Sequence, residues 1–433
     1  MNKLVKFLGG LGYPISIVII TNFLIVGVVA SYLDFPQIYW LGYIIPIINV
    51  FSRTAKHSVQ RKEIVLVIIW FVYLTINWLF WTKGIALKTI SIKDYIIPTL
   101  VLFIVSKITF DEYQLNYMYK LLRVVVLVQP LFIFQQFFYI AVSTSKRAFD
   151  WDLITGTFGF NYEGGGGNSA GLLLLLCFFI VVCLEKIRLS SASRTDYVAL
   201  ASSMVSILMM ETKIVVILSL FAGLALTRKG DVFKLSYFMK IFVLLPAFIL
   251  IVIYSYNANF STGDKAGRTL EMYMLDISNS YSDELINFDT GEVGRQSSLL
   301  LWWERNFKYG ITFDSVFGHG LTSSKFSNSG IYDAVSYGSR INFASIQLTT
   351  LLWDVGLFGV MLCMLVLLSK SIYFLKARAA SVYISSFRRG GIFLALSFPL
   401  YSIYSNVLFS NPISYTIFIL FFSINFREVG KSC

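Results

Sequence analysis

Long apolar runs alternate with short polar connectors along most of the chain. Most of these runs approach the ~20 residues that a helix needs to cross the ~30 Å hydrocarbon core of a bilayer. Windowed hydrophobicity therefore predicts an all-α polytopic membrane protein with about twelve transmembrane helices. The predicted spans lie near residues 14–32, 36–52, 64–82, 94–110, 120–143, 169–185, 196–211, 213–227, 235–256, 343–373, 391–409 and 411–426.

One long polar stretch, residues 257–341, interrupts the alternation between the ninth and tenth predicted spans. It divides the sequence into residues 1–256, which hold nine spans with short loops, the polar loop itself, and residues 342–433, which hold three spans. Binding and catalytic residues are often carried by loops on a rigid scaffold. The 257–341 loop is therefore the first place where a functional site is expected.

The tenth apolar run, residues 343–373, is longer than a single crossing requires and contains Gly356 and Gly359. Glycine is unfavourable in a helix interior. The run therefore predicts an interfacial helix that joins the span proper at these two glycines.

Basic residues set the expected orientation. They are concentrated in four connectors, and the positive-inside rule places such connectors in the cytoplasm. With about twelve spans, all four connectors and both termini fall on the cytoplasmic side, and the 257–341 loop falls on the periplasmic side. The connectors are Arg53–Lys62, Lys186–Arg194, Arg228–Lys234 and Lys376–Arg389.

One small connector disagrees with this orientation, because Lys83, Lys88 and Lys93 fall on the periplasmic side. Either this connector binds an anion, or the boundaries of the spans on both sides of it are misplaced. The sequence leaves both explanations open.

Composition and charge agree with a membrane protein. Hydrophobic residues make up 56% of the chain and charged residues 14%, whereas a soluble domain is about 25% charged. The net charge of +12 follows mostly from the cytoplasmic connectors, because the 257–341 loop holds ten acidic and seven basic residues. We therefore expect membrane lipid around the protein and no nucleic-acid partner.

A run of four glycines, Gly164–Gly167, leads into a helix predicted to begin near Asn168. Glycine lets backbone N–H groups approach a ligand closely, and a helix N-terminus favours phosphate. This pattern makes Asn168 a candidate phosphate ligand. The simpler explanation is a flexible turn with Asn168 as the helix N-cap.

The segment upstream contains Asp150-Trp151-Asp152, a D-x-D pattern with which many glycosyltransferases hold a divalent metal on a diphosphate. The same two carboxylates can also cap a loop at the membrane surface. The chain has only two histidines, and it has no cysteine in a predicted external loop. A zinc site is therefore not expected, and we expect neither a metal nor a cofactor.

Lys213 ends a short external turn, Glu211-Thr212-Lys213, between the seventh and eighth predicted spans. Ionisable residues next to hydrocarbon are costly and are functional candidates by default. A cation at a helix N-terminus opposes the helix dipole, which suggests that an external anion offsets its charge. The alternative is a Glu–Lys pair that extends to the interface.

The 257–341 loop itself carries three short motifs in a row: Gly294-Arg295, Trp302-Trp303 and Gly318-His319-Gly320. A guanidinium group binds phosphate oxygens as a bidentate fork, and tryptophan faces suit the apolar faces of sugars. His319 can titrate near neutral pH. Any one arginine here has the simpler interpretation of a surface residue. The spacing favours a site in which Arg295 binds phosphate and Trp302 and Trp303 bind sugar.

These features together resemble the O-antigen polymerase and O-antigen ligase superfamily, which also has about twelve spans and a long periplasmic loop between the ninth and tenth. The matching motifs are short. They are an Asn-containing turn before the sixth span (Asn161 to Asn168), a basic residue between the seventh and eighth spans (Lys213), a Gly-Arg followed by Trp and Gly-x-Gly (Gly294-Arg295, Trp302, Gly318-His319-Gly320) and a Gly-x-x-Gly (Gly356 to Gly359).

Such a resemblance implies a GT-C-like membrane glycosyltransferase in the bacterial inner membrane. The donor would be a glycan on undecaprenyl diphosphate, and the acceptor would be a sugar hydroxyl on a second lipid-linked repeat unit. Arg295 and Lys213 would stabilise the departing diphosphate. A chain-length regulator and a flippase would be its partners. The candidates for the base that takes the acceptor proton are Glu163, His319 and Asp333.

Two departures separate this chain from the ligases of that superfamily. Ligases carry arginine where this chain has Lys213, and they carry a His-Asn pair near the position of Ser345-Ile346. Both departures favour a repeat-unit polymerase, whose product would be an O-antigen, a capsule or an exopolysaccharide. The alternatives are an O-antigen ligase and a lipid-linked oligosaccharide flippase or similar transporter. A transporter would carry more ionisable residues in the middle of its spans.

Overall fold

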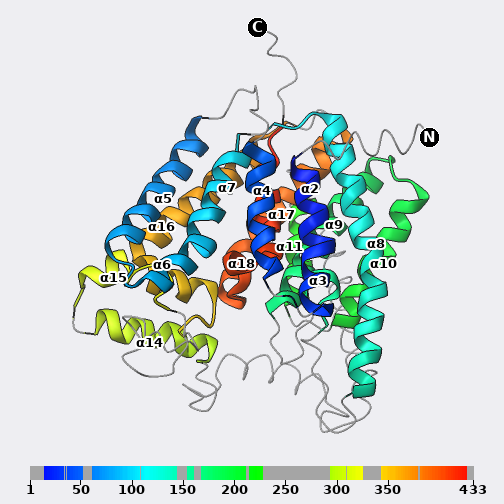
Figure 1. Cartoon of the computed structure of the whole chain (residues 1–433). Coiled ribbons are helices and arrows are strands. Elements are labelled where there is room, and N and C mark those ends of the chain that lie inside the picture. Colours follow the sequence, from blue (N-terminus) through cyan, green and yellow to red (C-terminus); the bar gives the residue numbers. More distant parts are fainter. Residues whose placement is uncertain are drawn as a thin grey trace.

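The computed structural model of the chain is built almost entirely of helices that lie side by side in one bundle (Figure 1). Among the described residues, an isolated bridge between Phe110 and Phe426 is the one extended pairing. The structure describes residues 14–33, 35, 37–51, 61–107, 109–143, 154–159, 167–210, 214–227, 293–308, 310–324, 343–378 and 381–426.

In the amino-terminal part of the bundle, two helices each contain a π-helical turn: η1 lies between α2 and α3, and η2 lies between α6 and α7. π-helical turns are rare and often occur near functional sites. The elements are α2 (Pro14–Ile20), η1 (Thr21–Val26), α3 (Gly27–Tyr32), α4 (Ile38–Phe51), α5 (Arg61–Phe80), α6 (Ile85–Ser91), η2 (Ile92–Ile96), α7 (Ile97–Val105) and α8 (Glu112–Ser143).

The remaining described elements complete the bundle and add two short helices at one end of it (Figure 1). They are η4 (Gly156–Phe158), α9 (Gly167–Arg188), α10 (Arg194–Met210), α11 (Val215–Leu226), α14 (Arg295–Phe307), α15 (Phe313–Phe317), α16 (Gln347–Lys376), α17 (Val382–Tyr404), α18 (Val407–Ser410) and α19 (Pro412–Ser423).

Four helices in the described chain are long and apolar enough to cross a membrane: Ile15–Tyr32, Glu112–Phe138, Asn168–Arg188 and Gln347–Lys376. Shorter apolar helices are Ile64–Phe80, Val215–Leu226 and Pro412–Ser423. The predicted all-α character is confirmed, and the apolar helices fit a membrane protein. The predicted span at 235–256 and most of the 257–341 loop lie outside the described residues.

Apolar side chains cover the outside of the bundle as well as its core. Their spacing of three or four residues places them on one outward face of each helix. Contiguous exposed apolar surface of this kind marks contact with a membrane. The exposed residues on α5 include Val65, Ile68, Val72 and Ile76, and those on α16 include Met361, Leu365, Leu368 and Ile372.

Two arginine side chains cap the C-terminus of α11 at one end of the bundle. Arg188 Nη1 donates to the carbonyl of Leu226 at 2.7 Å, and Arg389 Nη1 donates to the carbonyl of Ala225 at 3.1 Å. Cations at a helix C-terminus satisfy orphan carbonyls and complement the dipole. The connectors 186–194 and 376–389 therefore lie together at this end.

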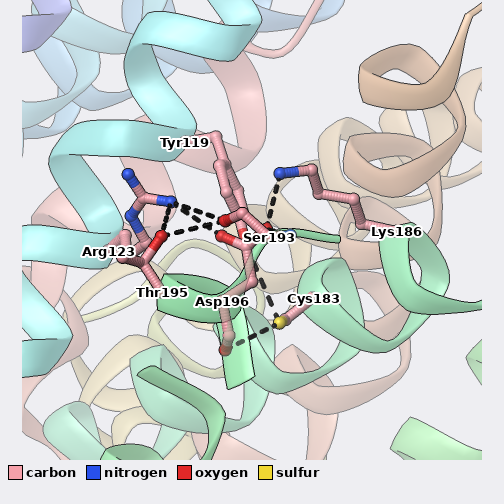
Figure 2. A network of polar contacts seen from close by, with 7 residues as sticks. All are labelled: Tyr119, Arg123, Cys183, Lys186, Ser193, Thr195 and Asp196. Atoms are coloured by element: carbon pink, nitrogen blue, oxygen red, sulfur yellow. Dashed lines mark hydrogen bonds and ion pairs between the residues drawn. The ribbon is translucent and has the colours of Figure 1, made fainter. Parts of the chain in front are cut away.

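A buried carboxylate joins three helices near the same end (Figure 2). Asp196 of α10 is fully buried. Its oxygens lie 2.8 Å from Arg123 Nη1 of α8 and 2.8 Å from Lys186 Nζ of α9. The backbone N–H of Ser193 donates to the same carboxylate at 2.8 Å, as in a helix capping box. The cluster fixes the relative positions of α8, α9 and α10.

α16 bends at Gly356, where φ is 65° and ψ is −176°. This backbone region is essentially restricted to glycine. The prediction that the 343–373 run joins two helical pieces near Gly356 is confirmed. A Cβ on Gly359 would lie 2.9 Å from the ring of Tyr73 on α5, so this glycine allows α5 to pack closely on α16.

The bend receives the turn that contains Gly318. A Cβ on Gly356 would lie 2.4 Å from the amide nitrogen of Gly318, and a Cβ on Gly318 would lie 2.5 Å from the carbonyl oxygen of Asp354. The Tyr73 hydroxyl lies 2.9 Å from the carbonyl of Phe317 and 2.6 Å from that of Val355. These contacts fasten the turn to the bend.

We predict that Gly356→Ala destabilises the protein. The backbone conformation alone costs roughly 1–3 kcal/mol for a residue other than glycine, and the added methyl group overlaps the turn at Gly318. The midpoint of thermal unfolding in detergent should fall. Gly223→Ala in α11 is the matched control, since its Cβ would meet nothing within 4 Å. Equal midpoints for the two variants would contradict the bend.

Candidate active site

α14 lies across the end of the bundle opposite the capping arginines (Figure 1). Trp302 anchors it, being 4% exposed in a cluster with Phe343, Leu352 and Trp353. Trp303 is 59% exposed, and its ring stacks on Phe307 with centroids 4.8 Å apart. Of the two tryptophans predicted to bind sugar, Trp303 presents its surface outward, whereas Trp302 holds α14 on α16.

Arg295 is the first residue of α14. Its guanidinium carbon lies 4.4 Å from the centre of the Tyr404 ring at the end of α17. The hydroxyl of Ser345 donates to the carbonyl of Val293 at 2.5 Å, which ties this segment to the start of α16. A guanidinium that stacks on an aromatic face keeps its N–H groups in the plane for bidentate bonds. The arrangement is compatible with the predicted phosphate ligand.

Asn168 lies in the first turn of α9, which begins at Gly167 as expected. Its Oδ1 accepts a hydrogen bond from Nδ2 of Asn411 at 2.6 Å, and its Nδ2 donates to the carbonyl of Gly159 at 3.3 Å. Asn411 in turn caps α19 through the amide of Ile413. Asn168 therefore holds the entry to α9 against the start of α19.

Two glutamines on α8 support this entry, and the sequence analysis did not single them out. Gln136 Oε1 accepts from the amides of Thr155 and Gly156 at 3.0 and 2.8 Å. Gln129 Oε1 accepts from the amide of Thr157 at 3.0 Å. Non-helical backbone within an apolar bundle is tolerated only where its polar groups are satisfied. In the sequence, the signal for this support was the pair of glutamines seven residues apart in the apolar run of α8.

His319 lies in the turn that docks on the bend of α16. Its amide donates to the carbonyl of Trp353 at 2.8 Å, and its ring centre lies 5.3 Å from that of Trp353. Nε2 lies 3.2 Å from Oδ1 of Asn306. In the neutral imidazole, a hydrogen bond to Oδ1 requires the tautomer that carries its proton on Nε2, which leaves the lone pair on Nδ1. Nδ1 lies 3.8 Å from the carboxylate of Asp314.

The surroundings of His319 favour the neutral imidazole. Burial lowers the pKa of His319, the carboxylate of Asp314 partly opposes this, and the positive charges of Arg305 and Lys83 lower the pKa further. Since the pKa falls below the ordinary value of 6.5, His319 is neutral at pH 7 and can accept a proton. This state is the one that a general base requires.

Lys83 reaches this turn from the connector that disagreed with the positive-inside rule. The hydroxyl of Thr82 accepts from the amide of Leu321 at 3.0 Å, and a Cβ on Gly320 would lie 2.7 Å from the carbonyl of Trp81. The backbone next to Lys83 therefore touches the backbone next to His319. In the sequence, the lysines of this connector, which fall on the side where the positive-inside rule expects few, were the signal that marked this position.

Asp354 holds the end of the same turn and was also missed. Its Oδ1 accepts from the amide of Ser324 at 2.8 Å and from the hydroxyl of Ser323 at 3.2 Å. Its Oδ2 accepts from the hydroxyl of Tyr95 in η2 at 2.6 Å. Asp354 is fully buried, so these donors replace the water that a carboxylate would otherwise bind.

Of the predicted site residues that the structure describes, Arg295 and His319 thus lie near the two ends of α14. Arg295 and Asn306 are eleven residues apart on this helix, which separates their Cα atoms by about 16 Å. Arg295 lies at one end, and His319 lies at the other next to Asn306. One phosphate cannot contact both.

Several predicted site residues lie outside the described residues, so their positions relative to α14 are not given. Among the residues that the structure does describe, no group of three His, Cys, Asp or Glu side chains could hold a metal ion. The residues outside the described ranges are Glu163, Lys213, Asp333, Asp150 and Asp152.

Comparison with known proteins assigns no family. No protein-family model matches the chain, and no curated protein matches it. The resemblance to the O-antigen polymerase and ligase superfamily therefore remains one of layout and short motifs, and the function has to be argued from the residues themselves.

We predict that His319 makes stability depend on pH. Between its lowered folded pKa and the unfolded value of 6.5, the unfolded chain binds more protons than the folded one. The free energy of unfolding must then decrease as the pH falls through this window. The thermal midpoint should drop more for the wild type than for His319→Gln between about pH 7.5 and about pH 5.5. Equal drops would show that His319 is not held neutral by the fold.

Proposed function

We propose that this chain is a membrane glycosyltransferase that polymerises oligosaccharide repeat units linked to undecaprenyl diphosphate. The main support is that three motifs of the resemblance meet in one structural unit. Arg295 begins α14, Trp302 anchors α14 on α16, and the turn around His319 docks into the bend at Gly356. The three motifs therefore lie along α14 and in the turn that follows it.

The proposed topology has about twelve spans, with both termini in the cytoplasm and residues 257–341 in the periplasm of a bacterial inner membrane. Its support is that the two basic connectors that the structure describes, 186–194 and 376–389, lie at one end of the bundle, whereas α14 and α15 lie at the other (Figure 1). Reporter fusions at Asn279 and Cys433 should report different compartments. The same compartment for both fusions would contradict the topology.

The proposed reaction forms a bond between the acceptor hydroxyl oxygen and the anomeric carbon of the donor glycan. The bond from that carbon to the diphosphate oxygen breaks, and undecaprenyl diphosphate leaves with the electron pair. Arg295, together with Lys213, stabilises the negative charge that develops on the diphosphate. The donor already carries a good leaving group, so the reaction needs no nucleotide.

The acceptor proton passes to a base at the same end of the bundle. Among the described residues, His319 is the candidate that the fold supports, because it is partly buried, oriented by Asn306 and neutral at pH 7. Glu163 and Asp333 remain candidates from the sequence. General base catalysis of this kind contributes about 10²–10⁴-fold in rate.

The function is tested by the polysaccharide ladder of a strain that lacks this chain. We predict that such a strain attaches a single repeat unit to its surface acceptor, because a polymerase is needed for longer chains. Wild-type chain supplied on a plasmid should restore the ladder. Complete absence of repeat units, with lipid-linked polymer accumulating, would indicate a ligase. Absence of any repeat unit on the periplasmic side would indicate a flippase.

The same strain tests Arg295. We expect Arg295→Ala to reduce polymer about 100- to 1000-fold, which is the usual cost of losing one group that stabilises a developing oxyanion. Arg295→Lys should recover only part of this loss, because an ammonium group cannot form the bidentate fork. Arg268→Ala is the control, since Arg268 also follows a glycine in the polar loop. Normal polymer from Arg295→Ala at normal protein level would disprove the assignment.

A further inference from the structure

A second group of cations lies at the far end of α14 from Arg295. Arg305 is exposed in the last turn of α14, next to Asn306, whose side chain contacts His319. Lys83 is exposed in the connector whose backbone touches Gly320 and Leu321. Two segments far apart in the sequence, the connector at Lys83 and residues 305–319, therefore bring Lys83, Arg305 and His319 to one place.

The electrostatics of His319 agree with this arrangement. Both Lys83 and Arg305 lower the pKa of the imidazole, so each of them lies within effective Coulombic range of the ring. Lys83 and Arg305 carry like charges, which repel each other when both are held near the same ring, and the carboxylate of Asp314 also lies nearby, 3.8 Å from Nδ1. An anion bound there would relieve the repulsion and could accept hydrogen bonds from both side chains.

The other two lysines of this connector already have partners within the fold. Lys88 Nζ donates to the carbonyl of Leu79 at 3.3 Å, and Lys93 Nζ lies 3.3 Å from the carboxylate of Asp94. Lys83 makes no such hydrogen bond or ion pair with any residue that the structure describes. The anion that the charge disagreement suggested is therefore best placed at Lys83.

Apolar side chains around these cations indicate a lipid. The three most exposed large hydrophobic residues in the described part of the chain are Ile85 at 87%, Phe80 at 76% and Ile311 at 75%. Two of them flank Lys83 in the sequence, and the third precedes α15, where the ring of Phe313 lies 5.6 Å from that of Trp81. Cations beside exposed apolar side chains are suited to an amphiphile at a membrane interface.

We propose that Lys83 and Arg305 bind the diphosphate head group of a second polyprenyl-linked substrate, while Ile85, Phe80 and Ile311 contact its lipid chain. This inference rests on the proposed function, which requires two lipid-linked substrates in one reaction. Arg305 and Arg295 are ten residues apart on α14, or about 15 Å along the helix. Two head groups can bind at this separation without overlapping, one at each end of the helix.

The test is binding of undecaprenyl diphosphate to the purified full chain in nanodiscs of phosphatidylcholine, counted by native mass spectrometry. The wild type should bind two molecules. The double variant Lys83→Ala/Arg305→Ala should bind one, with affinity for the lost molecule reduced about tenfold or more. Arg295→Ala should also retain one, and the triple variant should retain none. Lys88→Ala is the matched lysine control and should bind two.

Three results would overturn the proposal. Two molecules bound by the double variant would show that the cations are not the ligands. Nanodiscs with phosphatidylglycerol in place of undecaprenyl diphosphate give the second result: equal binding of this lipid to the wild type, lost in the double variant, would show a surface for bulk anionic lipid. Binding of inorganic diphosphate as tightly as the lipid would show a site for a soluble anion. If binding behaves as expected but the deletion strain keeps its full ladder, the proposed function fails and the head-group site stands.

Discussion

The bend of α16 at Gly356 is the constraint on which the candidate active site depends. An apolar bundle offers no water to backbone groups, so a helix can open only where other protein groups satisfy the carbonyls that it exposes. Tyr73 supplies one donor, and Asn77 supplies another to the carbonyls of Phe317 and Asp354 at 3.1 and 3.3 Å. The donors on α5 join the bend to the turn at Gly318, so neither can form without the other.

The segment 154–159 obeys the same rule with different residues. Its backbone leaves the helical conformation inside the bundle, and Gln129 and Gln136 take over the hydrogen bonds that a helix would have made. Both irregular segments lead to the end of the bundle that carries α14. Polar side chains in the spans of this protein therefore serve mainly to shape backbone, and the charged groups of the candidate active site stand at the surface of that end.

Hydrophobic pattern predicted the all-α character of the chain and the break near Gly356, because both depend on local composition, but it did not predict α14 and α15, which lie in the polar 257–341 stretch. It did not reveal the contact of Thr82 with Leu321 or that of Asp354 with Tyr95, since these join residues 239 and 259 positions apart. The sequence also contained enough information to predict which of Trp302 and Trp303 is packed and which is exposed. Leu299, Trp302 and Asn306 recur at helical spacing, which marks one face of α14 as the packed face. This period assigns Trp302 to the packed face and leaves Trp303, one position further on, facing outward.

The Asp196 cluster bears on how the protein is inserted. Asp196 of α10 meets Lys186 of α9 and Arg123 of α8, and a lone carboxylate entering the bilayer on one helix is costly. Lys186 alone can neutralise it in a hairpin of α9 and α10, but the guanidinium of Arg123 would then lack its carboxylate. The three helices consequently have reason to leave the insertion machinery as one unit, with α8 retained beside the lateral opening until α10 has been synthesised.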